Sequence, residues 1–334
     1  MTGGRDRLDP AVARARLLVR RSLADLDPGD LVLVGLSGGA DSLALAVATG
    51  FVAPRVGLRW GGVVVDHRLQ PGSDRVAAAA AEQARALGAD PVRVERVDVT
   101  SAGPLGPEGS AREARLAALG RVAAETSAVA VLLAHTRDDQ AETVLLGLAR
   151  GSGPRSLAGM APQAGLLRRP LLDLARTQTE RVCEVAGLTP WIDPHNADPA
   201  YARSRVRTEV LPVLEKQLGP GVADALARTA DLLRADTDLL DLLAQDLLAA
   251  VRVSAGGVAL DVAGLAAAPA ALRGRVLRTA ALDAGAPATD LTSGHVADLE
   301  RLVTDWHGQQ GVDLPGRLRA SRDGATLRFT RDPP

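Results

Sequence analysis

The stretch LVLVGLSGGADS runs from Leu31 to Ser42 and joins a short apolar run to a glycine turn. The apolar run Leu31–Leu36 predicts a buried strand, and the pattern from Asp41 onward predicts a helix. Glycines permit a tight turn, and free amide groups at a helix start, together with the helix dipole, form an anion site. The stretch therefore predicts a phosphate-binding loop at residues 37–42. An ordinary strand-to-helix turn, with Ser and Asp as caps, is the simpler alternative.

The first half of the chain alternates apolar runs with helical patterns. The further apolar runs lie at residues 61–66, 91–97 and 129–134. The helical patterns lie at residues 41–49, 73–87 and 110–125, with a flexible glycine-rich loop at residues 103–109. This alternation predicts an α/β fold, with a doubly wound, mostly parallel sheet covered by helices on both faces. Ligands of such sheets bind at the carboxyl ends of the strands, near a topological switch point.

The second half of the chain has a different pattern. Residues 155–219 predict helices and loops, and residues 221–251 carry Leu and Ala at helical spacing over a long stretch. Helical patterns and short strand-like runs, such as residues 325–330, follow this stretch. We therefore expect an α/β domain at residues 1–216, and then a helical linker with a smaller C-terminal α+β domain at residues 217–334.

Composition excludes several classes of protein. The chain has 334 residues, a net charge of −1 and a single cysteine, Cys183, which rules out a disulfide framework and a paired-thiol redox site within one chain. No apolar run reaches the roughly 18 residues that span a bilayer, and the N-terminus lacks a signal-peptide pattern, so we expect a cytoplasmic protein without a membrane partner. Lys216 is the one lysine. Arginine suits phosphates and bases, although codon bias explains its abundance more simply.

Polar residues follow two other predicted elements at the edge where the phosphate loop is expected. Asp66 and His67 close the second apolar run, and Arg112 and Arg115 lie three residues apart on a predicted helix. A capped strand end and a solvated arginine pair are the simpler interpretations. With a phosphate loop beside them, Asp66 and His67 are favoured as nucleotide contacts.

The segment HTRDDQAET at residues 135–143 follows the fourth apolar run and brings carboxylates to the same edge. Its simpler interpretation is helix capping, with Asp139 and Glu142 forming a capping box. Carboxylates at that edge also suit Mg²⁺ or a cationic amine substrate. The candidates are Asp138, Asp139 and Glu142.

The string Ser37–Ser42 resembles the PP-loop of the ATP-pyrophosphatases, which hold pyrophosphate and split ATP between its α and β phosphates. A Walker A loop needs Gly-Lys-Ser/Thr, and no lysine stands near this loop in the sequence. The resemblance implies ATP and Mg²⁺ as cofactors, with metal contacts from Asp41 and Asp138. It also implies nucleotide contacts from Ser37, Gly38, Gly39, Ala40, Asp41, Ser42, Asp66, His67 and His135.

Later segments resemble one family of this superfamily, the tRNA(Ile)-lysidine synthases. The resemblance covers residues 30–216 well and is looser beyond them. The segments are HTRDDQAET at 135–143, GSG at 151–153, LAGM at 157–160, RPLL at 169–172, DPHN at 193–196 and RSRVR at 203–207. The string AREARL at 111–116 resembles a further motif of the family, with Leu116 in place of the usual aromatic residue.

This second resemblance implies a ligase. It would adenylate O2 of the wobble cytidine in a tRNA(Ile) with a CAU anticodon, and free L-lysine would then displace AMP at C2. A homodimer is a further expectation, and residues 217–334 are expected to bind the tRNA. The resemblance implies catalytic roles for Asp41, Arg112, Arg115, Asp139, Glu142 and Arg205.

Three other functions stay open from the sequence. A tRNA thiolase of the same superfamily usually needs cysteine pairs, which this sequence lacks, and a glutamine-dependent amidotransferase needs a nucleophilic-cysteine domain. A non-catalytic nucleotide-sensing or RNA-binding protein belongs to a different class. The intact strings at residues 37–42 and 138–142 argue against it, and ATP–pyrophosphate exchange separates it from an enzyme.

Overall fold

The computed structural model describes residues 8–68, 72–97, 106–151, 153–194, 198–253 and 257–331. The chain divides into two compact units, Met1–Leu233 and Arg234–Pro334. The division falls within the long helix α10 (Val222–Val251), in the region where the sequence predicts a helical linker. None of the helices in the described ranges is long and apolar enough to cross a membrane.

The first unit contains a sheet whose six described strands lie in the order β3-β2-β1-β4-β6-β5. The strands are β1 (Leu31–Leu36), β2 (Arg59–Asp66), β3 (Val92–Arg96), β4 (Ala130–Leu132), β5 (Gln163–Ala164) and β6 (Leu167–Arg168). All neighbouring pairs are parallel except β5–β6, which is antiparallel. Since β2 and β3 extend the sheet on one side of β1 and β4 lies on the other, β1 and β4 flank a topological switch point, where ligands of open α/β sheets bind.

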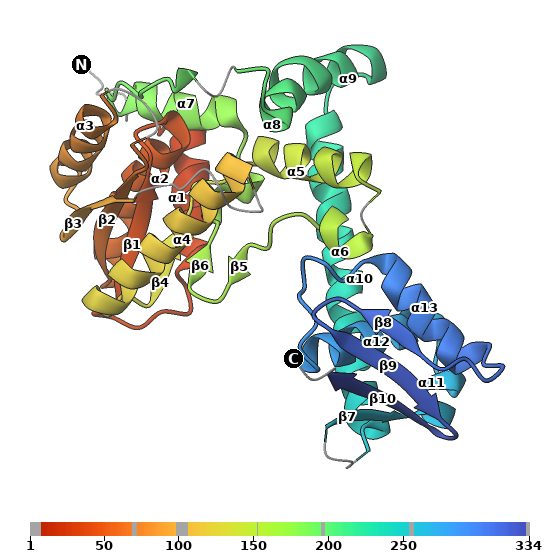
Figure 1. The fold of residues 1–334 in the computed structure, drawn as a ribbon. Helices are drawn as coiled ribbons and strands as arrows, with labels where there is room; N and C mark the ends of the chain where they lie inside the picture. The colour runs from red at the N-terminus through yellow and green to blue at the C-terminus, as the bar shows by residue number, and fades with distance from the viewer. Residues whose placement is uncertain are drawn as a thin grey trace, which may run out of the picture. The chain divides into compact units, whose positions relative to one another are not determined.

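Helices cover both faces of this sheet (Figure 1). The helices that share one core are α1 (Pro10–Ser22), α2 (Ala40–Val52), α3 (Ser73–Ala86) and α7 (Arg176–Val185). On the other face α4 (Gly106–Thr126) packs against the strands. Because successive side chains of a strand point to opposite faces, Val32 and Val34 lie in the first core and Leu31 and Leu33 in the second.

Shorter elements complete the first unit, and two predictions fail among them. They are η1 (Ala53–Val56), α5 (Arg137–Ala149), α6 (Pro154–Leu157), η2 (Pro170–Asp173), α8 (Ala202–Arg205), η4 (Val206–Val210) and α9 (Leu211–Leu218). The loop predicted at residues 103–109 is already helical from Gly106, and its earlier residues lie outside the described ranges. Residues 155–219 also contribute β5 and β6, which at two residues each are too short for hydrophobic periodicity to reveal.

The second unit has its own antiparallel sheet, in the order β7-β10-β9-β8. Its elements are β7 (Val258–Asp261), α11 (Val262–Ala267), α12 (Ala270–Asp283), α13 (Ser293–Thr304), β8 (Val312–Leu314), β9 (Leu318–Asp323) and β10 (Thr326–Arg331). A separate core of aliphatic side chains and Phe329 joins the sheet to the helices. The predicted smaller α+β domain is confirmed, and the strand-like run at residues 325–330 corresponds to β10.

Candidate active site

The phosphate loop, residues 37–42, connects the carboxyl end of β1 to the first turn of α2. Gly38 has a φ of +80°, a left-handed conformation that glycine adopts without strain. The Ser42 hydroxyl accepts the Ser37 backbone N–H at 3.2 Å and donates to the Gly39 carbonyl at 2.9 Å. These bonds fold the loop around the N-terminus of α2, where the helix dipole favours an anion.

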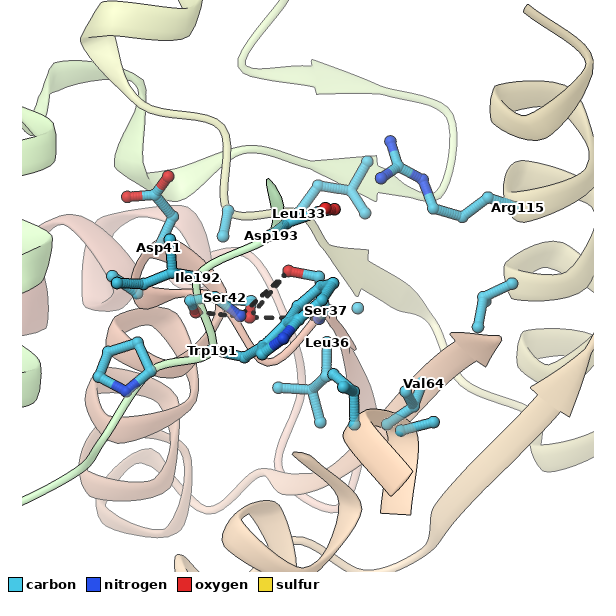
Figure 2. A pocket seen from close by; sticks show the side chains of 18 of the residues that line it. Leu36, Ser37, Asp41, Ser42, Val64, Arg115, Leu133, Trp191, Ile192 and Asp193 are labelled. Carbon is cyan, nitrogen blue, oxygen red and sulfur yellow. Dashed lines mark hydrogen bonds between the residues drawn. The ribbon is translucent and has the colours of Figure 1, made fainter. Parts of the chain in front are cut away.

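The loop forms part of the wall of a cavity of about 1050 Å³ in the first unit (Figure 2). Pockets for small ligands usually measure about 300–1000 Å³, so this cavity is at the upper end of that range and has room for a nucleotide. Most of the predicted site residues line the wall. They are Ser37, Gly39, Ala40, Asp41, Ser42, Asp66, His67, Arg112, Arg115, His135 and Asp139.

Two carboxylates of α5 are surrounded by three arginines from later in the chain. Glu142 is fully buried and accepts the Nε of Arg207 at 2.7 Å and the Nε of Arg203 at 2.8 Å. Asp139 accepts the Nη2 of Arg176 at 3.0 Å and the Nη2 of Arg207 at 3.2 Å. We call these five residues the carboxylate–arginine cluster. Two negative charges against three positive ones leave this cluster with one excess positive charge.

Asp139 has a second task, at the start of α5. Its Oδ2 accepts the backbone N–H of Thr136 at 2.8 Å and the Thr136 hydroxyl at 2.9 Å. Thr136 is the N-cap and Asp139 is the third helical residue, and these two residues form the capping box of α5. The prediction that Asp139 and Glu142 form it is therefore wrong by one helical turn. Burial raises the pKa of Asp139, but Arg176, Arg203 and the Thr136 amide together lower it by a larger amount. The pKa is therefore below its ordinary value, and the carboxyl stays ionised.

Asp41, the second residue of α2, joins the phosphate loop to the cluster. Its Oδ1 accepts the Thr179 hydroxyl at 2.5 Å, and its Oδ2 lies 3.5 Å from the Nε of Arg176. Burial raises the pKa of Asp41, and the contacts with Thr179 and Arg176 oppose this rise. A carboxylate beside bound phosphates suits Mg²⁺, which uses one or two carboxylates together with phosphate oxygens.

The predicted partner of Asp41 in metal binding, Asp138, is not on the cavity wall. Its carboxylate accepts the backbone N–H of Arg176 at 2.8 Å, which fixes the start of α7. Within the ranges that the structure describes, no group of three or more His, Cys, Asp or Glu side chains forms a metal site. Asp41 is therefore the better candidate of the two for a metal contact.

Three side chains on the wall carry buried nitrogens that have no hydrogen-bond partner in the described structure. They are the Nδ1 atoms of His67 and His135 and the Nε of Arg115. Burial lowers the pKa of His67, and it lowers that of His135 to about 3, so both imidazoles are neutral at neutral pH. Leaving polar groups buried without partners is costly, so water or a polar ligand in the cavity must complete their hydrogen bonding.

Two predicted catalytic residues lie away from the cavity wall. Arg205 is exposed, and its Nη1 donates to the carbonyls of Pro199 at 2.6 Å and Ala200 at 3.1 Å, contrary to the prediction. Arg203 and Arg207 reach the cavity instead, because residues four apart share a helix face. Glu142 lies behind the wall, covered by the arginines.

The site also contains Arg176, Arg203 and Arg207, which the sequence patterns do not assign to it. The four-residue spacing of Arg203 and Arg207 on a helix is a signal that favours them over Arg205. Arg176 gives no such signal, because its carboxylate partners on α5 lie 34 and 37 residues away in the sequence. Only the packing of α7 beside α2 and α5 brings Arg176 to the cluster.

Comparisons with known proteins agree with this geometry. A family model described as PP-loop domain matches residues 15–214, and one described as TilS substrate binding domain matches residues 260–326. The chain is 57% identical over 323 residues to the tRNA(Ile)-lysidine synthase of Thermobifida fusca (strain YX), with 97% of this chain and 98% of the relative covered. The chain belongs to the tRNA(Ile)-lysidine synthase family. The Streptomyces coelicolor family member is 52% identical, with 95% of this chain and 97% of the relative covered.

The fold of the first unit is shared more widely. The structure of the U34-tRNA thiolase NcsA from Methanococcus maripaludis with its 4Fe-4S cluster has a TM-score of 0.56 and covers 67% of this chain and 80% of that chain. At 21% identity, this likeness shows the fold alone. The PP-loop domain confirms the predicted use of ATP.

Proposed function

We propose that this protein ligates free L-lysine to C2 of the wobble cytidine in a tRNA(Ile) with a CAU anticodon, at the expense of ATP. The observation that carries the proposal is one cavity that holds both a PP-loop and an ionised carboxylate, Asp139, in a chain of this family. The reaction would take place in the cytoplasm, where tRNA is modified. The predicted homodimer stays a prediction.

In the first step O2 of the cytidine attacks the α-phosphorus of ATP, and pyrophosphate leaves. The phosphate loop would hold the leaving phosphates through its backbone amides and the dipole of α2. Arg112, Arg115 and Arg176 line the same cavity and would stabilise the negative charge that develops on the pyrophosphate. Mg²⁺ held by Asp41 would neutralise phosphate charge when bound.

In the second step a lysine amine forms a bond to C2, the C2–O2 bond breaks, and AMP leaves with the oxygen. The amine loses a proton, and Asp139, the carboxylate of the cluster that lies on the cavity wall, would accept it. Glu142 is a weaker candidate than Asp139, because it does not reach the cavity wall and is covered by Arg203 and Arg207. We assign it the positioning of those arginines.

We also propose that residues 217–334 bind the tRNA and that residues 1–216 form the catalytic domain. In support, the substrate binding domain model matches residues 260–326. Arg319 and Arg328 lie on adjacent strands, β9 and β10, and Arg317 precedes β9. Arginine forms bidentate contacts with phosphate, so these side chains suit an RNA backbone.

The test is transfer of labelled lysine onto RNA. With ATP and Mg²⁺, the protein should label a tRNA with a CAU anticodon and release one AMP for each lysine. A tRNA with a UAU anticodon should stay unlabelled, because uridine has no exocyclic amine at C4 to delocalise the positive charge created when lysine replaces O2. Release of AMP without label on RNA, for every amino acid tried, would contradict the proposal and leave only the use of ATP.

A further inference from the structure

An extended segment after α7 crosses the phosphate loop. Its residue Trp191 donates its backbone N–H to the Gly38 carbonyl at 2.9 Å, and Leu188 donates to the Cys183 carbonyl at 2.9 Å. The segment is therefore held by its main chain at two points. The Trp191 side chain lies on the cavity wall beside the phosphate loop, as Figure 2 shows.

Trp191 is partly exposed, to about the same extent as Trp306 of the second unit, which is 37% exposed. Trp191 is 36% exposed and the next residue, Ile192, is 85% exposed, and both line the cavity. Trp60, by comparison, is 4% exposed in the core of the same unit. The hydrogen bond to Gly38 uses backbone atoms only, so it does not involve the indole.

Aromatic side chains are scarce in this protein. The sequence has three Trp, one Tyr and two Phe among 334 residues. Of the described residues on the cavity wall, Trp191 is the only one of these three types. The cavity thus has one large flat apolar side chain on its wall, and this side chain adjoins the phosphate loop.

We propose that the Trp191 indole is the stacking platform for a nucleobase in this cavity, with Ile192 extending its apolar surface. Unpaired bases bind proteins by stacking on aromatic side chains, and a base lies one sugar away from its phosphate. The base comes either from ATP or from the anticodon loop. Trp191 is a positioning residue in this proposal. The inference rests on the proposed function only if the base comes from the anticodon loop.

The test uses the emission of Trp191 in the full chain. A Trp306→Phe background leaves Trp191 and the buried Trp60 as the two tryptophans. Titration with a non-hydrolysable ATP analogue forms one arm, and titration with an anticodon stem-loop carrying CAU forms the other. Stacking predicts saturable quenching in one arm or in both, and the quenched arm identifies the source of the base.

Affinity measured by calorimetry then separates stacking from support of the loop. Trp191→Ala should lower the affinity for the ligand that quenches the emission by roughly 5- to 150-fold, the range that corresponds to loss of one base–aromatic stack. Trp191→Phe keeps a flat ring and should lose roughly 3-fold or less. The urea unfolding profile of each variant reports whether the fold is intact.

Two outcomes would overturn the inference. One is unchanged emission in both arms. The other is an equal loss of affinity in Trp191→Ala and Trp191→Phe, which would mean that the residue only supports the loop. Quenching by the ATP analogue in a protein that never labels RNA with lysine would contradict the proposed function and leave the stacking role in place.

Discussion

Replacing Glu142 by Gln should destabilise the first unit strongly, although the two side chains have nearly the same shape. Both carboxylate oxygens are in use: Arg207 donates to each of them, at 2.7 and 3.0 Å, and Arg203 donates to Oε2 at 2.8 Å. An amide supplies one oxygen only, so its NH₂ group must face a guanidinium. Three half-buried guanidinium groups would then share Asp139, and Arg176 has a further carboxylate nearby, that of Asp41 at 3.5 Å.

The size of the effect follows from these contacts. Removing one partner of a buried ion pair costs about 3–5 kcal/mol, because the remaining charge is left without compensation. Single hydrogen bonds to charged groups contribute about 1.5–3 kcal/mol, so the loss of two of them gives a similar figure. Since a folded unit is stable by only about 5–15 kcal/mol, the Glu142→Gln variant should lose a substantial part of that stability.

The assay is urea unfolding followed by the emission of Trp60, in a Trp191→Phe, Trp306→Phe background where Trp60 is the one remaining tryptophan. The matched control is Glu82→Gln on α3, whose partner Arg85 lies three residues away at the surface and whose loss should cost about 0.5 kcal/mol. A Glu142→Gln variant within 1 kcal/mol of the parent would refute the argument that the cluster stabilises the fold through its charges.

Three further changes test other parts of the site. Cys183→Ala should keep AMP release within about twofold, because burial raises the thiol pKa to about 11 and the proposed chemistry needs no thiolate; a folded but inactive variant would contradict this. Gly159→Ala should cost about 2–4 kcal/mol in urea unfolding, since φ is +63° and the new Cβ would lie 2.6 Å from the Gln140 amide oxygen; an unchanged midpoint would show that the turn can relax. Arg205→Ala should retain AMP release, whereas Arg203→Ala should lose at least tenfold; equal activities would remove the cluster from catalysis.

Local sequence patterns determine the framework of the first unit. The run Leu31–Leu36 forms β1, and the helical stretch at 73–87 forms α3, because hydrophobic periodicity and buried strands depend on neighbours in the chain. The phosphate loop was predictable for a similar reason. Glycine at residue 38 provides the left-handed turn, and Ser42 provides the hydroxyl that closes it, within one short string.

Tertiary structure decided which charged side chains meet. The run Arg203–Arg207 contains three arginines. The orientation of this helical segment against α5 brings Arg203 and Arg207 to Glu142, whereas Arg205 is exposed to solvent. Burial also changes the role that can be assigned to Glu142. The sequence favours it as a substrate contact, but in the fold it is fully buried and covered by guanidinium groups. Such pairings join residues 34 to 68 positions apart, and no local pattern encodes which of them approach. Trp191 is likewise brought to the phosphate loop by tertiary structure. Its backbone hydrogen bond to Gly38 joins segments about 150 residues apart in the sequence, and this bond depends on the packing of α7 on α2.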